Sequence, residues 1–202
     1  MGILVTEFVN PSQIDSVSFV DLSAYGSPTS VAVHNGIVAV AVANPIVQND
    51  GVIVFFDASF TILNVITVGA LPDMVVYTPD GNYVLVANEG EPSDDYTVDP
   101  DGTISLIDIS GGIGSATVQT AGFGAFTVAM IPDVRVFGNG TTDVAADLEP
   151  EFITVNSTST KAYISLQENN AIAVLDIATA TIEEILALGY KDYGQVGNYI
   201  DA

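Results

Sequence analysis

The chain has 202 residues, of which 25 are acidic and 3 are basic, so its formal net charge at pH 7 is −22. Hydrophobic residues make up 49 % and charged residues 14 % of the chain, which is the composition of a globular protein and not of a disordered one. The negative charge excludes nucleic acid and anionic membranes as partners, because phosphate groups would be repelled, and the absence of cysteine excludes disulfides, thiolate metal sites and cysteine nucleophiles.

The N-terminal region contains the first predicted strand. Residues 15–22 (DSVSFVDL) have the pattern of an outermost strand, but no three strands precede it to form the rest of a sheet. No basic segment followed by an apolar core follows Met1, so no signal peptide is visible. Since no apolar run reaches the roughly 18 residues that a membrane helix requires, membrane insertion is not expected.

An internal repeat begins near residue 27. Three segments can be superposed: SPTSVAVHNGIVAVAVAN with DGVIVFFD, LPDMVVYTPDGNYVLVAN with DGTISLID, and EPEFITVNSTSTKAYISLQ with NNAIAVLD. They share an opening proline and an aspartate that closes the third strand, namely Pro28, Pro72 and Pro150, and Asp57, Asp108 and Asp176. Each segment ends in one more β-like run: TILNVITV, SATVQT and TIEEILAL. A period of about 44 residues with four short strands is typical of a propeller blade.

Residue alternation and turn chemistry support these strands. Val31 and Val33, and then every second residue of IVAVAVA, place β-branched side chains on one side of an extended chain. The pairs Asn35-Gly36 and Asp80-Gly81 predict tight hairpin turns. The predicted fold class is therefore all-β, a β-propeller fragment of about three to four four-stranded antiparallel blades.

The predicted organisation leaves the propeller incomplete. Its parts are an outer strand of an incomplete blade (15–22), a blade unit (27–70), a second unit (71–120) with an acidic insertion (88–102), a further insertion (121–147), a third unit (148–190) and a tail (191–202). Fewer than about four blades cannot close a ring, and an open edge strand pairs with another strand. The expected partners are the remaining blades, from the same or another chain, or a second copy bound through the open edges.

The insertion NEGEPSDDYTVDPDG is the first candidate site. It replaces the short hairpin between the second and third strands of the other units, and loops on a rigid scaffold are where binding residues concentrate. Its carboxylates and carbonyls form an oxygen-only ligand set, which suits Ca²⁺ far better than Zn²⁺. Two interpretations stay open, a Ca²⁺ site or a solvated acidic loop. The candidate ligands in this loop are Glu89, Glu91, Asp94, Asp95 and Asp99.

A second acidic group lies at the third unit. Glu149 and Glu151 flank Pro150, and Glu168 follows the second strand of this unit, as Glu89 follows that of the preceding one. Because equivalent positions of neighbouring blades lie side by side, we expect Glu89, Glu151 and Glu168 to face one shared opening. The alternative is that PE and QENN only form turns.

The chain also resembles a known family. The segments LPDMVVYTPDGNYVLVANEGEPSDDYTVDPDGTISLIDIS, DLEPEFITV, KAYISLQENNAIAVLDIATATI and LGYKDY resemble, in this order, the first half of bacterial exported propeller proteins of the choice-of-anchor I family. That family is similar to surface-layer YVTN-type propellers and, remotely, to esterase-like phytase and calcium-dependent alkaline phosphatase propellers. The resemblance implies an extracellular or cell-surface location. In the phytase-like and phosphatase propellers, glutamates at blade ends hold Ca²⁺ ions that bind phosphate.

Two functions remain open at this stage. The first is an exported, Ca²⁺-binding propeller module with a structural, adhesion or surface-assembly role, and the second is a Ca²⁺-dependent phosphoester hydrolase or a fragment of one. No catalytic residue is assigned, because His34 is the sole histidine and would have to support a Ser/His/Asp triad alone.

Overall fold

The computed structural model of the chain describes residues 1–10, 13–137 and 143–197. It contains three four-stranded antiparallel sheets and an N-terminal hairpin, and this arrangement confirms the predicted all-β propeller fragment. Blade 1 consists of β3 (Ser27–His34), β4 (Ile37–Ala43), β5 (Asp50–Phe56) and β6 (Ile62–Ala70). Blade 2 consists of β7 (Pro72–Tyr77), β8 (Tyr83–Asn88), β9 (Thr103–Asp108) and β10 (Thr117–Gly122). Blade 3 consists of β11 (Pro150–Val155), β12 (Lys161–Leu166), β13 (Ala171–Asp176) and β14 (Thr181–Ala187).

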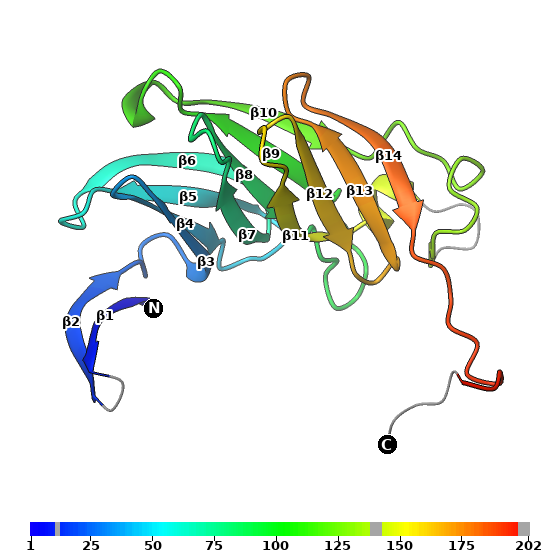
Figure 1. The fold of residues 1–202 in the computed structure, drawn as a ribbon, viewed down its shortest axis with the longest axis horizontal. Coiled ribbons are helices and arrows are strands. Elements are labelled where there is room, and N and C mark those ends of the chain that lie inside the picture. Colours follow the sequence, from blue (N-terminus) through cyan, green and yellow to red (C-terminus); the bar gives the residue numbers. More distant parts are fainter. Residues whose placement is uncertain (11–12, 138–142, 198–202) are drawn as a thin grey trace.

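The blades follow one another in an open arc, with blade 2 in the middle (Figure 1). The first strands lie beside each other, since β7 contacts both β3 and β11. Two short helices lie outside the sheets, the 3-10 helix η1 (Ile113–Ser115) and α1 (Val144–Asp147). Within the described residues, neither helix has the length and apolar character that crossing a lipid bilayer requires.

The opening proline of each repeat stands at a β-bulge. The ladder between the first and second strands shifts its register between Pro28 and Ser30 in blade 1, between Pro72 and Met74 in blade 2, and between Pro150 and Ile153 in blade 3. A proline fits there because it has no N–H to donate to the ladder. The bulge changes the direction of the side chain that follows the proline, which is Asp73 in blade 2 and Glu151 in blade 3.

The closing aspartate of each repeat organises the turn to the fourth strand. Its carboxylate accepts a hydrogen bond from a backbone N–H two or three residues later, as a short Asp side chain does in an Asx turn. The pairs are Asp57 with Ser59 (2.8 Å), Asp108 with Ser110 (2.9 Å) and Asp176 with Thr179 (2.9 Å). Hydrogen bonds from the hydroxyl and then the backbone N–H of Ser110 lower the pKa of Asp108. Hydrogen bonds from Lys161 and Thr179 lower the pKa of Asp176 to about 2.

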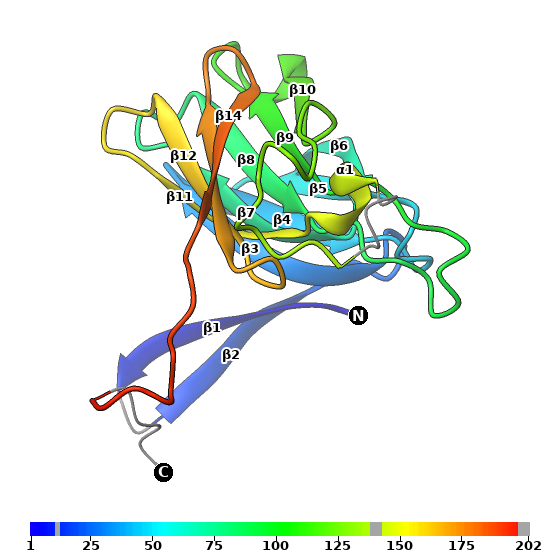
Figure 2. The ribbon, with the colours of Figure 1, turned by 90° about the vertical axis from the view of Figure 1, so that its right-hand side faces the viewer.

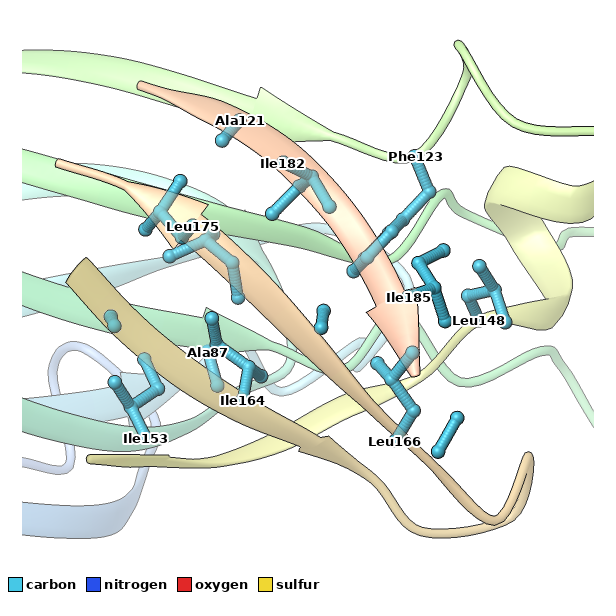
Figure 3. Close-up of a cluster of buried hydrophobic side chains, with 14 of the residues drawn as sticks. Ala87, Ala121, Phe123, Leu148, Ile153, Ile164, Leu166, Leu175, Ile182 and Ile185 are labelled. Carbon is cyan, nitrogen blue, oxygen red and sulfur yellow. The ribbon is translucent and has the colours of Figure 1, made fainter. Parts of the chain in front are cut away.

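The core lies between the blades and not within any one of them. Alternate side chains of β8 and β9, such as Leu85 and Ile104, pack onto alternate side chains of β12 and β13, such as Ile164 and Leu175 (Figure 3). The segment 123–148 has no strand, and it closes one end of this core by burying Phe123 and Leu148. Burial of aliphatic and aromatic surface between successive sheets therefore stabilises the arc.

The N-terminal hairpin stands apart from the blades. Strand β1 (Gly2–Asn10) pairs with β2 (Gln13–Asp21), a partner strand that was not predicted, and the ribbon extends away from the sheets (Figures 1 and 2). Its base contacts blade 1, where Leu22, Ile3 and Val20 pack on the outer face of that sheet.

Gly102 is expected to be sensitive to substitution because the next blade approaches its Cα closely. A Cβ at this position would lie 2.0 Å from the carbonyl oxygen of Leu148 and 2.7 Å from Cδ of Pro150. Gly102→Ala should therefore lower the free energy of unfolding by about 1–3 kcal/mol, the usual cost of overpacking. Urea unfolding measures this change. Gly114→Ala is the matched control, since no atom lies within 4 Å of a Cβ there, and equal effects of the two substitutions would refute the close contact.

Candidate functional site

The predicted glutamates gather where blades 2 and 3 meet. Glu89 follows the last residue of β8, Glu151 lies on β11 at the bulge, and Glu168 follows β12. The backbone N–H of Glu89 donates to the carbonyl oxygen of Leu71 at 2.9 Å, and this hydrogen bond holds Glu89 beside the start of the first strand of blade 2. The second-strand ends of both blades and the first-strand bulge of blade 3 thus place these carboxylates at the same end of the two blades.

The pKa of Glu89 is raised to about 8. Burial is the largest cause, because a half-buried carboxylate loses hydration, and the negative charges of neighbouring carboxylates add to it. Those neighbours are Glu91, Asp73, Glu151 and Glu149. In the described part of the chain, no basic group is among the charged neighbours that shift the pKa of Glu89. Lys161, one of the three basic residues, is instead bound by Asp176 at 2.8 Å and Glu183 at 2.6 Å.

Glu149 and Glu151 show the same effect. Burial, followed by the charges of Glu168, Glu91, Asp147 and Asp99, raises the pKa of Glu149 to about 7. The pKa of Glu151 is also raised to about 7, by burial and then by a hydrogen bond to the carboxyl group of Glu168. The raised pKa means that Glu151 keeps a proton at pH values where an exposed glutamate would be ionised.

One further hydrogen bond and one buried atom without a partner characterise Glu151 and Glu168. The side-chain amide of Gln167 donates to Oε1 of Glu151 at 3.2 Å. Oε2 of Glu168 is buried and has no hydrogen-bond partner in the described part of the chain. A buried carboxylate oxygen without a donor is costly, so this atom is suited to accept a ligand.

A cavity of about 560 Å³ adjoins these glutamates. Its carboxylates come from the acidic loop, from α1, from the residue before β11 and from the turn between β12 and β13, and no basic residue of the described chain lines it. The acidic lining residues are Glu91, Asp94, Asp99, Asp147, Glu149 and Glu168. Tyr96 and Phe137 line the same cavity, and both are largely exposed.

Asn169 connects the segments that carry Asp147 and Glu149 through hydrogen bonds of its side chain. It is fully buried, and its Nδ2 donates to the carbonyl oxygens of Arg135 and Asp147, each at 2.9 Å, and to Oδ2 of Asp147 at 3.1 Å. Its Oδ1 accepts the backbone N–H of Glu149 at 3.4 Å. One side chain therefore positions both acidic residues next to the entry of blade 3.

Asp95 is not part of the group of carboxylates that lies where blades 2 and 3 meet. Its Oδ1 accepts hydrogen bonds from the hydroxyl of Ser93 at 2.8 Å and from the N–H and hydroxyl of Thr97 at 3.1 and 2.7 Å. These bonds lower its pKa, and they make it the centre of a turn within the acidic loop. Asp95 thus has a local structural role.

Asp73 and Asp147 belong to the cluster although they were not predicted. Asp73 follows Pro72 as Glu151 follows Pro150, so the repeat itself carried the signal for it. Asp147 had no such signal, because only the fold of segment 123–148 brings it beside Asn169. In the described residues, no three acidic side chains already stand close enough to hold a metal ion.

His34 lies at the opposite end of its strand from the bulge. Its ring stacks on Tyr77 with centroids 5.4 Å apart, between blades 1 and 2. This contact explains the histidine as a packing residue at the blade interface.

Comparison with known proteins agrees with the fold. The model of the choice-of-anchor I domain family matches residues 2–202, and no curated protein matches the chain. A functionally unknown protein from Desulfotomaculum acetoxidans DSM 771 is similar with a TM-score of 0.59 and 16 % identity, over 93 % of this chain and 51 % of that one. The β-propeller domain of Cps50 (Swd1) from Myceliophteria thermophila has a TM-score of 0.56 and 9 % identity, over 94 % of this chain and 54 % of that one. The chain thus spans about half the length of these solved structures.

Proposed function

Because the chain belongs to the choice-of-anchor I domain family, we propose that it is a propeller module of an exported, surface-associated protein and binds Ca²⁺ where blades 2 and 3 meet. One observation carries the Ca²⁺ proposal: burial and mutual repulsion raise the pKa of Glu89 to about 8 and those of Glu149 and Glu151 to about 7. A bound dication would remove this repulsion.

The donor atoms support a hard cation. Every candidate ligand is a carboxylate, and Ca²⁺ takes six to eight oxygen ligands in flexible geometry, whereas zinc sites rely on His and Cys. Glu89, Glu149, Glu151 and Glu168 would hold the ion, with Glu91 reaching it from the loop. The unpartnered Oε2 of Glu168 is the strongest single candidate. Because these side chains do not yet converge on one point, binding includes their rearrangement.

The role of the ion would be structural. Glu89 comes from blade 2, whereas Glu149 and Glu151 come from the entry of blade 3. An ion between them would tie the two blades together and order the acidic loop. Such stiffening suits an adhesion or surface-assembly module.

A Ca²⁺-dependent phosphoester hydrolase is the second candidate. The cavity of about 560 Å³ beside the glutamates supports it, since that space would admit a phosphate group. With no basic lining residue, the phosphate would depend on the bound ion for its counter-charge.

Calorimetric titration with Ca²⁺ at pH 8, after treatment with a chelator, tests the proposal. We expect saturable binding by the natural chain and at least about tenfold weaker binding by the double variant Glu149→Gln, Glu168→Gln, because carboxylates are the ligands that Ca²⁺ requires. Glu184→Gln, at an exposed position on β14 outside the site, is the control and should bind like the natural chain.

A parallel assay with a chromogenic phosphate ester separates the two functions. Binding without turnover supports the structural module, and Ca²⁺-dependent turnover that the double variant loses supports the hydrolase. Equal Ca²⁺ affinities of the double variant and the Glu184→Gln control would overturn the site.

A further inference from the structure

Two of the three basic residues of the chain line one cavity at the end of blade 3. Arg135 belongs to segment 123–148, and Lys191 belongs to the segment LGYKDY, residues 188–193, where the chain leaves β14 (Figure 1). The cavity has a volume of about 710 Å³, which is in the range of ligand sites. No acidic residue of the described chain lines it, although the chain has 25 acidic residues and 3 basic ones. Most of the positive charge is therefore gathered at one place on an acidic protein.

The turn between β12 and β13 positions both basic segments. The N–H of Arg135 donates to the carbonyl oxygen of Asn169 at 3.1 Å, and Nδ2 of Asn169 donates to the carbonyl oxygen of Arg135 at 2.9 Å. The N–H of Leu188 donates to the carbonyl oxygen of Asn170 at 2.9 Å, and Nδ2 of Asn170 donates to the carbonyl oxygen of Gly189 at 2.7 Å. Two segments far apart in the sequence are thus held by successive residues of one turn, so the fold itself builds the cavity.

Both cations lie over aromatic rings and are not neutralised by carboxylates. The guanidinium carbon of Arg135 is 5.7 Å from the ring centroid of Phe137, and Nζ of Lys191 is 5.2 Å from that of Tyr193. Among the described residues, neither cation forms an ion pair with a carboxylate. Asp192 does not line the cavity, and its Oδ1 accepts the backbone N–H two residues later at 2.9 Å. An aromatic ring against the flat face of a guanidinium leaves its N–H edge available, and this edge fits the two oxygens of a carboxylate.

The other polar and aromatic lining residues suit a sugar ring. Tyr190 and Tyr193 are 73 % and 52 % exposed, and each offers a flat apolar face with a polar edge. The side-chain amides of Gln167 and Asn170 already donate to oxygens of the chain itself. Their amide oxygens are therefore suited to accept hydrogen bonds from the hydroxyl groups of a ligand.

We propose that this cavity binds a uronic acid residue of a polysaccharide, that is, a sugar ring that carries one carboxylate. The carboxylate pairs with Arg135 and Lys191, the ring packs on Tyr190, and ring hydroxyls donate to the amide oxygens of Gln167 and Asn170. A single carboxylate is outnumbered by the two cations. A phosphate polymer, in contrast, carries a charge on every unit, and its further charges would face the acidic surface of a chain of net charge −22. This site is separate from the proposed Ca²⁺ site and does not depend on it.

Amide NMR titration of the Ca²⁺-free chain at pH 7 tests the proposal. The first probe is a tetrasaccharide of alternating glucuronic acid and N-acetylglucosamine, and the second is a trimer of galacturonic acid. The methyl ester of each probe is the control, because it keeps the shape of the sugar and removes its charge. We expect chemical-shift changes at residues 135 and 188–193, and at least about tenfold weaker binding of the methyl esters, since they lose hydrogen bonds between charged groups. A chelator in the buffer keeps this result independent of Ca²⁺ binding.

Substitution of Arg135 gives a second measurement. Arg135→Gln should weaken binding of the better probe at least about tenfold, and Arg135→Lys should weaken it less, because lysine keeps the charge but not the two-pronged edge. Lys161→Gln is the matched control: it changes the net charge equally, but Lys161 lies outside the cavity.

Four results would each show the proposal to be wrong. The first is the absence of shift changes with both sugar probes at millimolar concentrations. The second is equal affinity for a probe and its methyl ester, and the third is equal affinity of Arg135→Gln and Lys161→Gln for the probe. The fourth is tighter binding of acetylated trialanine with a free carboxylate than of either sugar, which would assign the cavity to the C-terminus of a peptide.

Discussion

Replacing Asn169 by alanine is expected to lower the free energy of unfolding by about 2–4 kcal/mol, the cost of a small cavity plus buried polar groups left without partners. The side chain is fully buried, and its amide donates to the carbonyl oxygens of Arg135 and Asp147. Without it, both carbonyl oxygens lose this donor. The acidic residues Asp147 and Glu149 would also lose the group that positions them.

Urea unfolding measures this loss, with Asn49→Ala as the control at an exposed asparagine. The control should stay within about 0.5 kcal/mol of the natural chain, as surface substitutions do. Asn169→Asp gives a second check: it preserves the shape but replaces the donor that faces Asp147 with another carboxylate. Similar stabilities of Asn169→Ala and Asn49→Ala would contradict the role assigned to this residue.

The repeat made most of the fold predictable from sequence. Each blade repeats the same local chemistry, an opening proline at the bulge and an aspartate at the third turn, so that strands, turns and order of the sheets follow from short-range patterns. The same repetition predicted that Glu89 and Glu168, at equivalent second-strand ends of neighbouring blades, would face one opening with Glu151 at the start of the third unit. Periodicity therefore carries long-range information when the repeating units pack side by side.

Most of what escaped prediction lies outside the repeat, whereas Asp73 was missed although it follows Pro72 as Glu151 follows Pro150. Strand β1 pairs with β2 through a contact that no other unit displays, and segment 123–148 reaches its place through burial of Phe123 and Leu148. Asp147 and Asn169 meet only because that segment folds back on blade 3. Asp95 was grouped with the candidate ligands because composition cannot distinguish a carboxylate that faces a cavity from one that accepts hydrogen bonds within its own loop.

In Ca²⁺-free buffer the protein is expected to become less stable as the pH rises from about 5 to about 8. The folded-state pKa of Glu89 is about 8 and those of Glu149 and Glu151 are about 7, all above the ordinary value of 4.5. Between these values the folded state binds more protons than the unfolded state, so raising the pH favours unfolding. Discounted for the solvent screening of half-buried groups, the total loss is about 1–3 kcal/mol.

Glu89→Gln should reduce the loss of stability between pH 5 and pH 8. It should also stabilise the Ca²⁺-free protein at pH 8, because the variant carries no charge at this position. Thermal unfolding at pH 5 and pH 8, with and without Ca²⁺, measures the effect. Asp95→Asn is the matched control from the same loop: the pKa of Asp95 is lowered, so its titration falls below this pH range. Saturating Ca²⁺ should restore stability at pH 8 in the natural chain and act weakly at pH 5, where protons occupy the carboxylates. If the free energy of unfolding instead rises between pH 5 and pH 8 without Ca²⁺, the pKa values of these glutamates are not raised in the folded state. The proposal of an ion between the two blades would then be wrong.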